Sequence, residues 1–287
     1  MRSPRGRRLC SSIRPPTGSK RRWTTSRTAS AGSRVAPKPR SSSRIALVLL
    51  LVAGCATVPS REPIGEDAQR ALTRLAERSS EFTDLRTLAD IDLKQGEERQ
   101  HLRGVLLVKA PASVRFEALS PLGQPLLLVT VHDGRLTAYD AGKNEASTGP
   151  ANAETIAKAL GLPLEPGDLV AVLAGRAVPP NDLRRAELVP ADNAGPSLRL
   201  VGARARERVW LDLETGSVRQ LEISGKFDVL IKYRRAATGA LAGFDLDAAR
   251  SYVTGSIAYQ NPVENGGIDQ ERFELTIPKG AKIQTIR

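Results

Sequence analysis

The stretch Phe116-Glu-Ala-Leu-Ser-Pro-Leu-Gly-Gln-Pro-Leu-Leu-Leu-Val129 decides the fold. It holds two apolar segments of strand character, separated by the tetrapeptide Ser-Pro-Leu-Gly. Proline presets the backbone of the second position of a turn, and glycine suits the last position. The stretch therefore predicts two antiparallel strands joined by a tight turn, with Leu122 at its tip.

A leucine at the tip of a turn is costly to expose to water. Two arrangements are open for Leu122. It folds back onto the core, or it projects as a hydrophobic probe that touches lipid or an acyl chain. In both arrangements Pro121 and Gly123 shape the turn.

Strand patterns continue on both sides of this stretch. Two hairpin turns are predicted, at Gln95-Gly96 and at Asp133-Gly134, because such pairs between apolar runs favour tight turns. The expected strands cover 85–93, 100–109, 114–119, 125–131, 136–139, 185–189, 197–202, 208–213, 218–224, 227–233, 244–246, 256–260, 272–277 and 282–286. Many short strands at this spacing indicate an antiparallel sandwich or barrel.

Three segments have helical rather than strand periodicity. Apolar residues recur at helical spacing in 66–78, and two further helices are expected at 153–160 and 166–174. The second and third helices interrupt the β region, as a cover over a sheet would. The fold class is therefore α+β and mainly β, with a single domain over 66–287.

The amino-terminal part carries a targeting signal. The run Ile45-Ala-Leu-Val-Leu-Leu-Leu-Val-Ala-Gly-Cys55 follows basic residues and is about half the ~20 residues that a spanning helix needs. Its end, Leu51-Val-Ala-Gly-Cys55, resembles a bacterial lipoprotein box. This resemblance implies cleavage before Cys55 and diacylglycerol and acyl chains on that cysteine. The alternatives are an ordinary cleaved signal peptide and a single membrane anchor.

The charge of the chain changes once the leader is set aside. The whole chain has a net charge of +12, from 43 Lys and Arg against 31 Asp and Glu. Residues 1–54 hold 13 of the basic residues and no acidic one, so 30 basic and 31 acidic residues remain. A near-neutral mature chain gives no electrostatic argument for a nucleic-acid partner. We also expect that translation starts near Val35, and that 55–65 form a lipidated tether.

The sequence shows no constellation of catalytic residues. Its two histidines, His101 and His132, lie on a strand and in a hairpin turn, and Cys55 is the only cysteine after the leader. A hydrolytic site usually shows a nucleophile, a base and an orienting group in the sequence, and two histidines thirty-one residues apart without a cysteine do not fit the ligand pattern of a zinc site. We therefore expect a protein that is not an enzyme and holds no metal or cofactor apart from its own lipid.

At these residues the chain resembles the outer-membrane lipoprotein receptors of the LolB type, within the LolA and LolB superfamily. The resemblance rests on the lipoprotein box, the Ser-Pro-Leu-Gly turn and the Asp133-Gly134 hairpin. It continues through the helix 153–160 and the run Leu160-Gly-Leu-Pro-Leu-Glu-Pro-Gly-Asp-Leu169. It covers about 83–180, whereas the later strands agree only in pattern.

The resemblance implies an unclosed antiparallel β-barrel of about eleven strands, covered by helices around an apolar cavity. The cavity would receive the acyl chains of other lipoproteins, brought by a periplasmic lipoprotein carrier, and Leu122 would help to insert them into the outer membrane. The protein would then be a monomer anchored in that membrane and facing the periplasm. Candidate cavity residues are Leu102, Leu106, Val108, Phe116, Leu127, Val129, Ile156, Leu160, Leu169, Leu173 and Trp210. The alternative function is a structural lipoprotein that binds a protein partner or another lipid.

Overall fold

The structure is a computed structural model that describes residues 64–203, 205–225 and 228–286. These residues belong to one compact unit that spans Thr57–Arg287. The leader and Cys55 lie outside the described residues, so cleavage and lipidation stay predictions.

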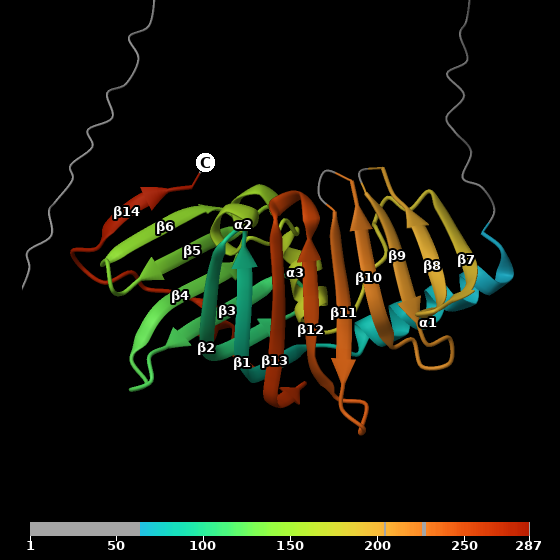
Figure 1. Cartoon of the computed structure of the whole chain (residues 1–287), viewed down its shortest axis with the longest axis horizontal. Helices are drawn as coiled ribbons and strands as arrows, with labels where there is room; N and C mark the ends of the chain where they lie inside the picture. Colours follow the sequence, from blue (N-terminus) through green and yellow to red (C-terminus); the bar gives the residue numbers. More distant parts are fainter. Residues whose placement is uncertain (1–63, 204, 226–227, 287) are drawn as a thin grey trace, which may run out of the picture. The chain divides into compact units, whose positions relative to one another are not determined.

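The described residues form a single sheet of 14 strands, which dominates the unit (Figure 1). Its first half is a meander in which each strand pairs antiparallel with the next. The strands of this half are β1 (Asp84–Gln95), β2 (Glu98–Lys109), β3 (Ser113–Leu119), β4 (Pro125–His132), β5 (Arg135–Asp140) and β6 (Glu145–Pro150).

The second half is another antiparallel meander, and its last strand pairs with β1. Its strands are β7 (Arg185–Asp192), β8 (Gly195–Val201), β9 (Arg206–Leu211), β10 (Val218–Ser224), β11 (Val229–Arg235), β12 (Leu241–Ala248) and β13 (Val253–Glu264). The short β14 (Lys282–Thr285) adds to β6 in parallel. Since β14 and β7 are at opposite ends of the strand order and do not pair in the described part of the chain, the sheet is unclosed.

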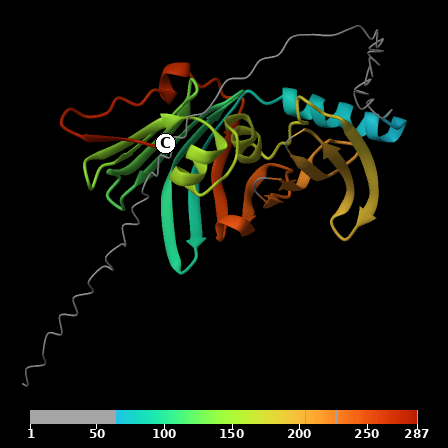
Figure 2. The same cartoon turned by 90° about the horizontal axis from the view of Figure 1, so that it is seen from above.

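Beside the sheet, the described part of the chain forms three α-helices: α1 (Glu66–Ser80), α2 (Ala153–Leu160) and α3 (Pro166–Leu173). The sheet curves, and α2 and α3, which connect β6 to β7, lie in its hollow (Figure 2). The side chain of Asn152 caps α2 by accepting hydrogen bonds from two backbone N–H groups of the first turn. None of these three helices is long and apolar enough to cross a bilayer.

The core forms where the concave face of the sheet meets the helices. On β2, Leu106 and Val108 point inward, and they belong to one buried cluster with Ile156 of α2 and Leu169 of α3. Alternate residues of a strand face opposite sides, so Val105 and Leu107 point to the convex face. The alternation of apolar residues thus decides which side of the sheet the helices cover.

The predicted hairpins and helices are confirmed. Asp133 and Gly134 both have positive φ angles, 47° and 69°, as a two-residue turn of the favoured hairpin type requires. The predicted helix 66–78 is α1, and the predicted helices 153–160 and 166–174 are α2 and α3.

Two strand predictions were wrong. No alternation of apolar residues marks β6, Glu-Ala-Ser-Thr-Gly-Pro, so the sequence did not reveal it. The sheet of the described residues has 14 strands, where the family resemblance implied about eleven. The segment 272–277 was expected as a strand, but it contains the end of a 3-10 helix, η2 (Gln270–Phe273), followed by irregular backbone. Its carbonyl oxygens at Arg272 and Glu274 accept hydrogen bonds from the Arg115 side chain instead of from a neighbouring strand.

Candidate ligand-binding site

A cavity of about 1270 Å³ lies on the helix-covered side of the sheet. Its wall combines the end of α1, both helices of the crossover, the loop after α3, and the adjacent ends of β9 and β10. This volume exceeds the ~300–1,000 Å³ of ordinary small-molecule sites. Its apolar lining includes Phe82, Leu164, Val170, Ala171, Val178 and Ile223.

Two carboxyl groups inside this cavity have shifted acidity. Asp168 is in the first turn of α3, and Glu207 is on the inward face of β9. Burial, with a smaller contribution from the negative charge of Asp168, raises the pKa of Glu207 to about 8. Burial and the nearby charge of Glu165 raise the pKa of Asp168. At neutral pH the Glu207 side chain is therefore largely protonated, which suits a wall in contact with apolar groups.

Arg176 enters the cavity wall directly after α3. Gly175, with a φ of 66°, ends the helix in the left-handed conformation, and the Arg176 N–H donates to the Ala171 carbonyl at 2.8 Å. This turn directs the Arg176 side chain inward, where the residue is only 4% exposed. Its Nη2 donates to Glu264 Oε2 at 2.9 Å. Burial, followed by the positive charge of Arg78, lowers the pKa of Arg176.

Two tyrosines of the sheet fix the carboxyl end of α3. Tyr259 Oη donates to the Leu173 carbonyl at 2.8 Å, and Tyr233 Oη donates to the Val172 carbonyl at 3.2 Å. The last carbonyl groups of a helix have no partner within it, and the bond from Tyr259 satisfies the buried carbonyl of Leu173. The Val172 carbonyl also accepts from the Gly175 N–H at 3.1 Å, so Tyr233 adds a second donor there. Burial raises the pKa of both phenols, which therefore stay protonated donors.

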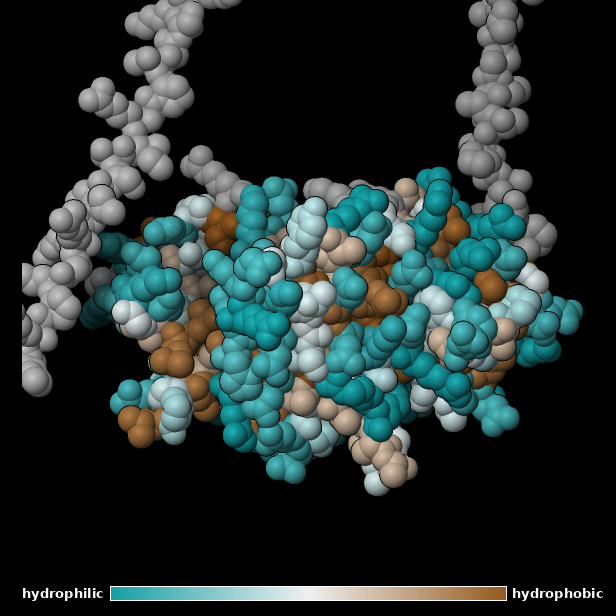
Figure 3. All heavy atoms as spheres, viewed as in Figure 1, coloured by the Kyte–Doolittle hydropathy of each residue, from teal (hydrophilic) through white to brown (hydrophobic). Residues whose placement is uncertain are grey.

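The turn between β3 and β4 projects from the sheet. Its Gly123 N–H donates to the Ser120 carbonyl at 2.8 Å, and Leu122 is 87% exposed at its tip. Leu126, at the start of β4, is also exposed. Apolar side chains gather at this hairpin tip in the space-filling view (Figure 3). Leu122 therefore projects from the turn and does not fold back onto the core, whereas its contact with lipid or an acyl chain stays a prediction.

Ten of the eleven predicted cavity residues, all except Trp210, belong to the packed interior of the sheet and helices. Those on the concave face or on α2 and α3 are buried in the core cluster or packed against it: Leu102, Leu106, Val108, Phe116, Leu127, Ile156, Leu160, Leu169 and Leu173. Val129 is buried opposite Phe116 in the β3–β4 ladder. None of the eleven is among the residues that line the open cavity, so their part in binding stays a prediction.

Trp210 occupies the opposite face from the cavity. It alternates with Glu207 and Val209 along β9, and its indole Nε1 donates to Asp192 at 2.9 Å. The Arg208 guanidinium lies 4.2 Å from the centre of its ring system. This geometry gives Trp210 a structural contact on the convex face.

The charged residues of the cavity were not singled out by the sequence. Asp168 looks like an ordinary acidic residue in the first turn of a helix, and Arg176 looks like a basic residue after a helix end. Glu207 gave a usable signal, because it shares the parity of Val209 and Leu211 on the inward face of β9. A polar residue at an inward strand position is an exception worth examining.

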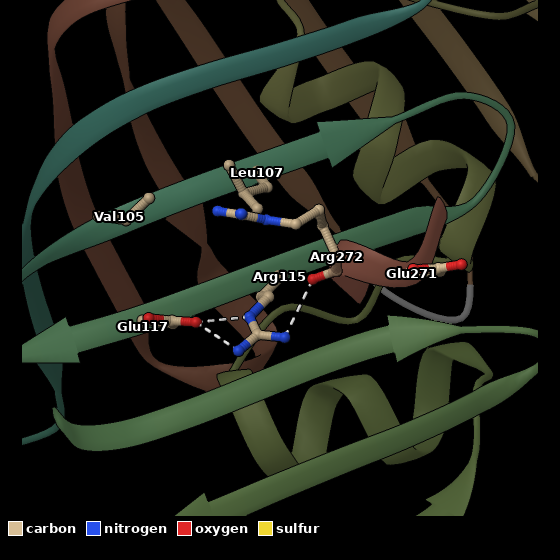
Figure 4. Close-up of a pocket in the computed structure, with 6 residues that line it drawn as sticks. All are labelled: Val105, Leu107, Arg115, Glu117, Glu271 and Arg272. Atoms are coloured by element: carbon tan, nitrogen blue, oxygen red, sulfur yellow. Dashed lines mark hydrogen bonds and ion pairs between the residues drawn. The ribbon is translucent and has the colours of Figure 1, made fainter. Parts of the chain in front are cut away.

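A smaller pocket of about 310 Å³ lies on the convex face, beneath η2 (Figure 4). Arg115 forms an ion pair with Glu117 there and donates at 3.0 Å to the carbonyl of Arg272, whose side chain extends over Leu107. Phe273 is buried beside His132, with 6.1 Å between ring centres. These contacts fasten the chain after β13 to the sheet. Among the described residues, no cluster of His, Cys, Asp and Glu could hold a metal ion.

Comparison with protein-family models and with curated proteins gives no match. Solved structures do match. One is a domain from Vibrio parahaemolyticus that is described as an outer membrane lipoprotein-sorting protein, at 11% identity and a TM-score of 0.50. The match covers 72% of this chain and 97% of that chain. The expected fold class is confirmed.

Two further structures have slightly lower scores. A LolA superfamily protein from Nitrosomonas europaea is 12% identical, with a TM-score of 0.49 over 72% of this chain and 97% of that chain. A DUF1329 family protein from Desulfovibrio piger is 10% identical, with a TM-score of 0.49 over 74% of this chain and 98% of that chain. At such identities the similarity concerns the fold alone.

Proposed function

We propose that this protein is a lipid-binding receptor of the LolB type, which holds acyl chains of other lipoproteins and helps to insert them into the outer membrane. The single observation that carries the proposal is the large, mainly apolar cavity under the helices. Leaving water favours a sixteen-carbon chain by roughly 12 kcal/mol, at ~0.8 kcal/mol per methylene, so such a site needs few polar contacts.

The projecting hairpin supplies the membrane contact in this proposal. The Leu122 side chain is 87% exposed, against 47% for Leu126. Its transfer from water into a bilayer would be favoured by about 1.5–3 kcal/mol. A lipid chain on Cys55 would hold the protein at the membrane surface, with at least two chains needed for stable anchoring. The similarity in fold to the domain described as an outer membrane lipoprotein-sorting protein supports the same assignment.

A transfer experiment tests the proposal. The compact unit 57–287, without Cys55, is mixed with a purified triacylated lipoprotein, and the complex is separated from the free proteins by gel filtration. We expect a complex with the acylated lipoprotein and none with its unacylated form. Absence of affinity for every acylated partner would end the proposal. A stable protein complex that forms without regard to acylation would favour the structural alternative.

A second measurement separates binding from delivery. We expect Leu122→Glu to form the complex normally but to lose about tenfold in the rate of lipoprotein delivery to liposomes, because a charged tip resists the bilayer. The matched control is Leu213→Glu, which changes another exposed leucine, in the turn after β9. Equal delivery by both variants would remove Leu122 from the mechanism.

A further inference from the structure

Three arginines lie close enough to interact electrostatically, one of them in the cavity wall, and the described residues do not satisfy all of their N–H groups. Arg78 is on the last turn of α1, Arg176 follows α3, and Arg235 ends β11. The atoms that are buried without a hydrogen-bond partner are Arg78 Nε, Arg176 Nε, Arg176 Nη1 and Arg235 Nε. Buried polar groups normally have partners, so this cluster requires an explanation.

The charges of the cluster do not balance. Arg176 is paired with Glu264 at 2.9 Å, and Arg78 is paired with Glu81 at 2.6 Å. Within the part of the chain that the structure describes, Arg235 donates only to backbone carbonyl groups, those of Gly175, Val218 and Gly239. Three guanidinium groups therefore face two carboxylates, and one positive charge is left over.

Electrostatic repulsion among the three arginines also favours the binding of a negative charge. The pKa of Arg176 is lowered by burial first and then by the positive charge of Arg78, and the same two causes lower the pKa of Arg235. An added negative charge would relieve this repulsion and supply acceptors for the unpaired N–H groups.

The cavity gives access to this cluster. Arg176 lines its wall together with Ser79 and Phe82, although the arginine itself is 4% exposed. Apolar residues line much of the remaining wall. Its acidic residues are the exposed Glu154, Glu165 and Asp182 and the more buried Asp168 and Glu207, of which Glu207 is largely protonated at neutral pH. A ligand that fits this arrangement has an apolar chain and one anionic end.

We propose that Arg176, with Arg78 and Arg235, binds the anionic head group, a carboxylate or a phosphate, of an alkyl amphiphile whose chain occupies the cavity. This inference rests on the proposed lipid-binding function and adds a ligand class to it. Arginine suits the task because its planar N–H groups match the oxygens of carboxylate and phosphate in pairs.

Three probes that share one alkyl chain test the head-group preference. The full chain, with Cys55→Ser so that no lipid of its own competes, is titrated with laurate, dodecyl phosphate and the uncharged dodecanol by equilibrium dialysis. We expect the two anions to bind at least about tenfold more tightly than dodecanol, as charge-assisted hydrogen bonds in a buried site provide. Inorganic phosphate alone should compete poorly with dodecyl phosphate.

Variants locate the preference at the arginines. Arg176→Met should remove most of the difference in affinity between the two anions and dodecanol, and it should leave the affinity for dodecanol unchanged. Arg176→Lys should keep part of that difference. Arg78→Met changes a more exposed position and should also reduce the difference in affinity. It provides a second test if Arg176→Met does not fold. The control is Arg74→Met, an exposed arginine of the same helix that is paired with Glu77.

The outcomes separate the two proposals. Equal affinity for laurate, dodecyl phosphate and dodecanol would overturn the anion site and leave lipid binding intact. The anion site would also be overturned if Arg176→Met bound none of the three ligands while Arg78→Met bound them all as the parent does. Displacement of dodecyl phosphate by an equal concentration of inorganic phosphate would overturn it as well. Failure of the unsubstituted chain to bind any of the three amphiphiles would instead count against the proposed function.

Discussion

The hydroxyl group of Tyr259 on β13 donates a hydrogen bond of 2.8 Å to the carbonyl of Leu173, the last residue of α3. Both residues are buried, and they are 86 positions apart in the chain. The bond ties a helix of the crossover to the middle of the sheet, beside the loop that carries Arg176. The position of α3, and with it one wall of the cavity, therefore depends on a side chain of the second half of the sheet.

Removal of this hydroxyl tests its contribution to stability. We expect Tyr259→Phe to lower the free energy of unfolding by about 1–3 kcal/mol, because the Leu173 carbonyl would stay buried without this partner. Urea denaturation followed by circular dichroism measures the change. Tyr252→Phe is the control, since Tyr252 is 79% exposed, and it should change stability by less than about 0.5 kcal/mol. Equal effects of both changes would refute the role of the bond.

The acidity of Glu207 predicts a dependence of stability on pH. Its pKa is about 8 in the folded protein, against a usual value of 4.5, so the folded state holds this proton more tightly than the unfolded state. The contribution of the Glu207 proton to the free energy of unfolding is therefore fully present below about pH 4.5, and it is lost as the pH rises to about 8. Glu207→Gln removes the titration, so the variant should gain stability relative to the parent as the pH rises.

Thermal unfolding at pH 5 and at pH 8 measures this difference. We expect Glu207→Gln to raise the melting temperature at pH 8 more than at pH 5, since each unit of pKa difference corresponds to about 1.4 kcal/mol. Glu187→Gln is the control, because Glu187 is an exposed residue of β7 that forms ion pairs with surface arginines. Parallel pH profiles for the parent and Glu207→Gln would contradict the buried titration.

The sequence reveals the sheet better than it reveals the site. Apolar alternation and turn residues predict most strands, because they act locally, as at Asp133-Gly134. The strand β6 and the segment around Phe273 escape this reasoning, since long-range pairing with β5 and contacts with Arg115 determine their backbones. The same holds for Arg78, Arg176 and Arg235. Each has an ordinary local explanation, and only the fold brings them together.

Gly104 of β2 marks a close approach between strands. A Cβ atom at this position would lie 2.0 Å from the Glu117 carbonyl oxygen of β3, a distance that no side chain can accept without backbone movement. We expect Gly104→Ala to destabilise the protein by about 1–3 kcal/mol or more, as overpacking does. Gly167→Ala, whose Cβ would meet its nearest atom at 3.8 Å, is the control for stability. Unfolding in urea compares the two variants, and a neutral Gly104→Ala would show that the strands separate easily.

Phe273 holds the chain after β13 against the convex face of the sheet. Its side chain is fully buried beside His132, and Arg115 donates to the carbonyl groups on both sides of it. Phe273→Ala should cost about 3–5 kcal/mol, because the change removes a large buried side chain and leaves a cavity. The segment should then detach before the sheet unfolds, since β14 alone pairs with β6 over a short stretch. Limited trypsin digestion should cut the variant early at Arg272 and Lys279, whereas Ile283→Ala, at an exposed position of β14, should resist like the parent. If Phe273→Ala is cut no faster than Ile283→Ala, the polar contacts of Arg115 rather than the aromatic ring hold the segment in place.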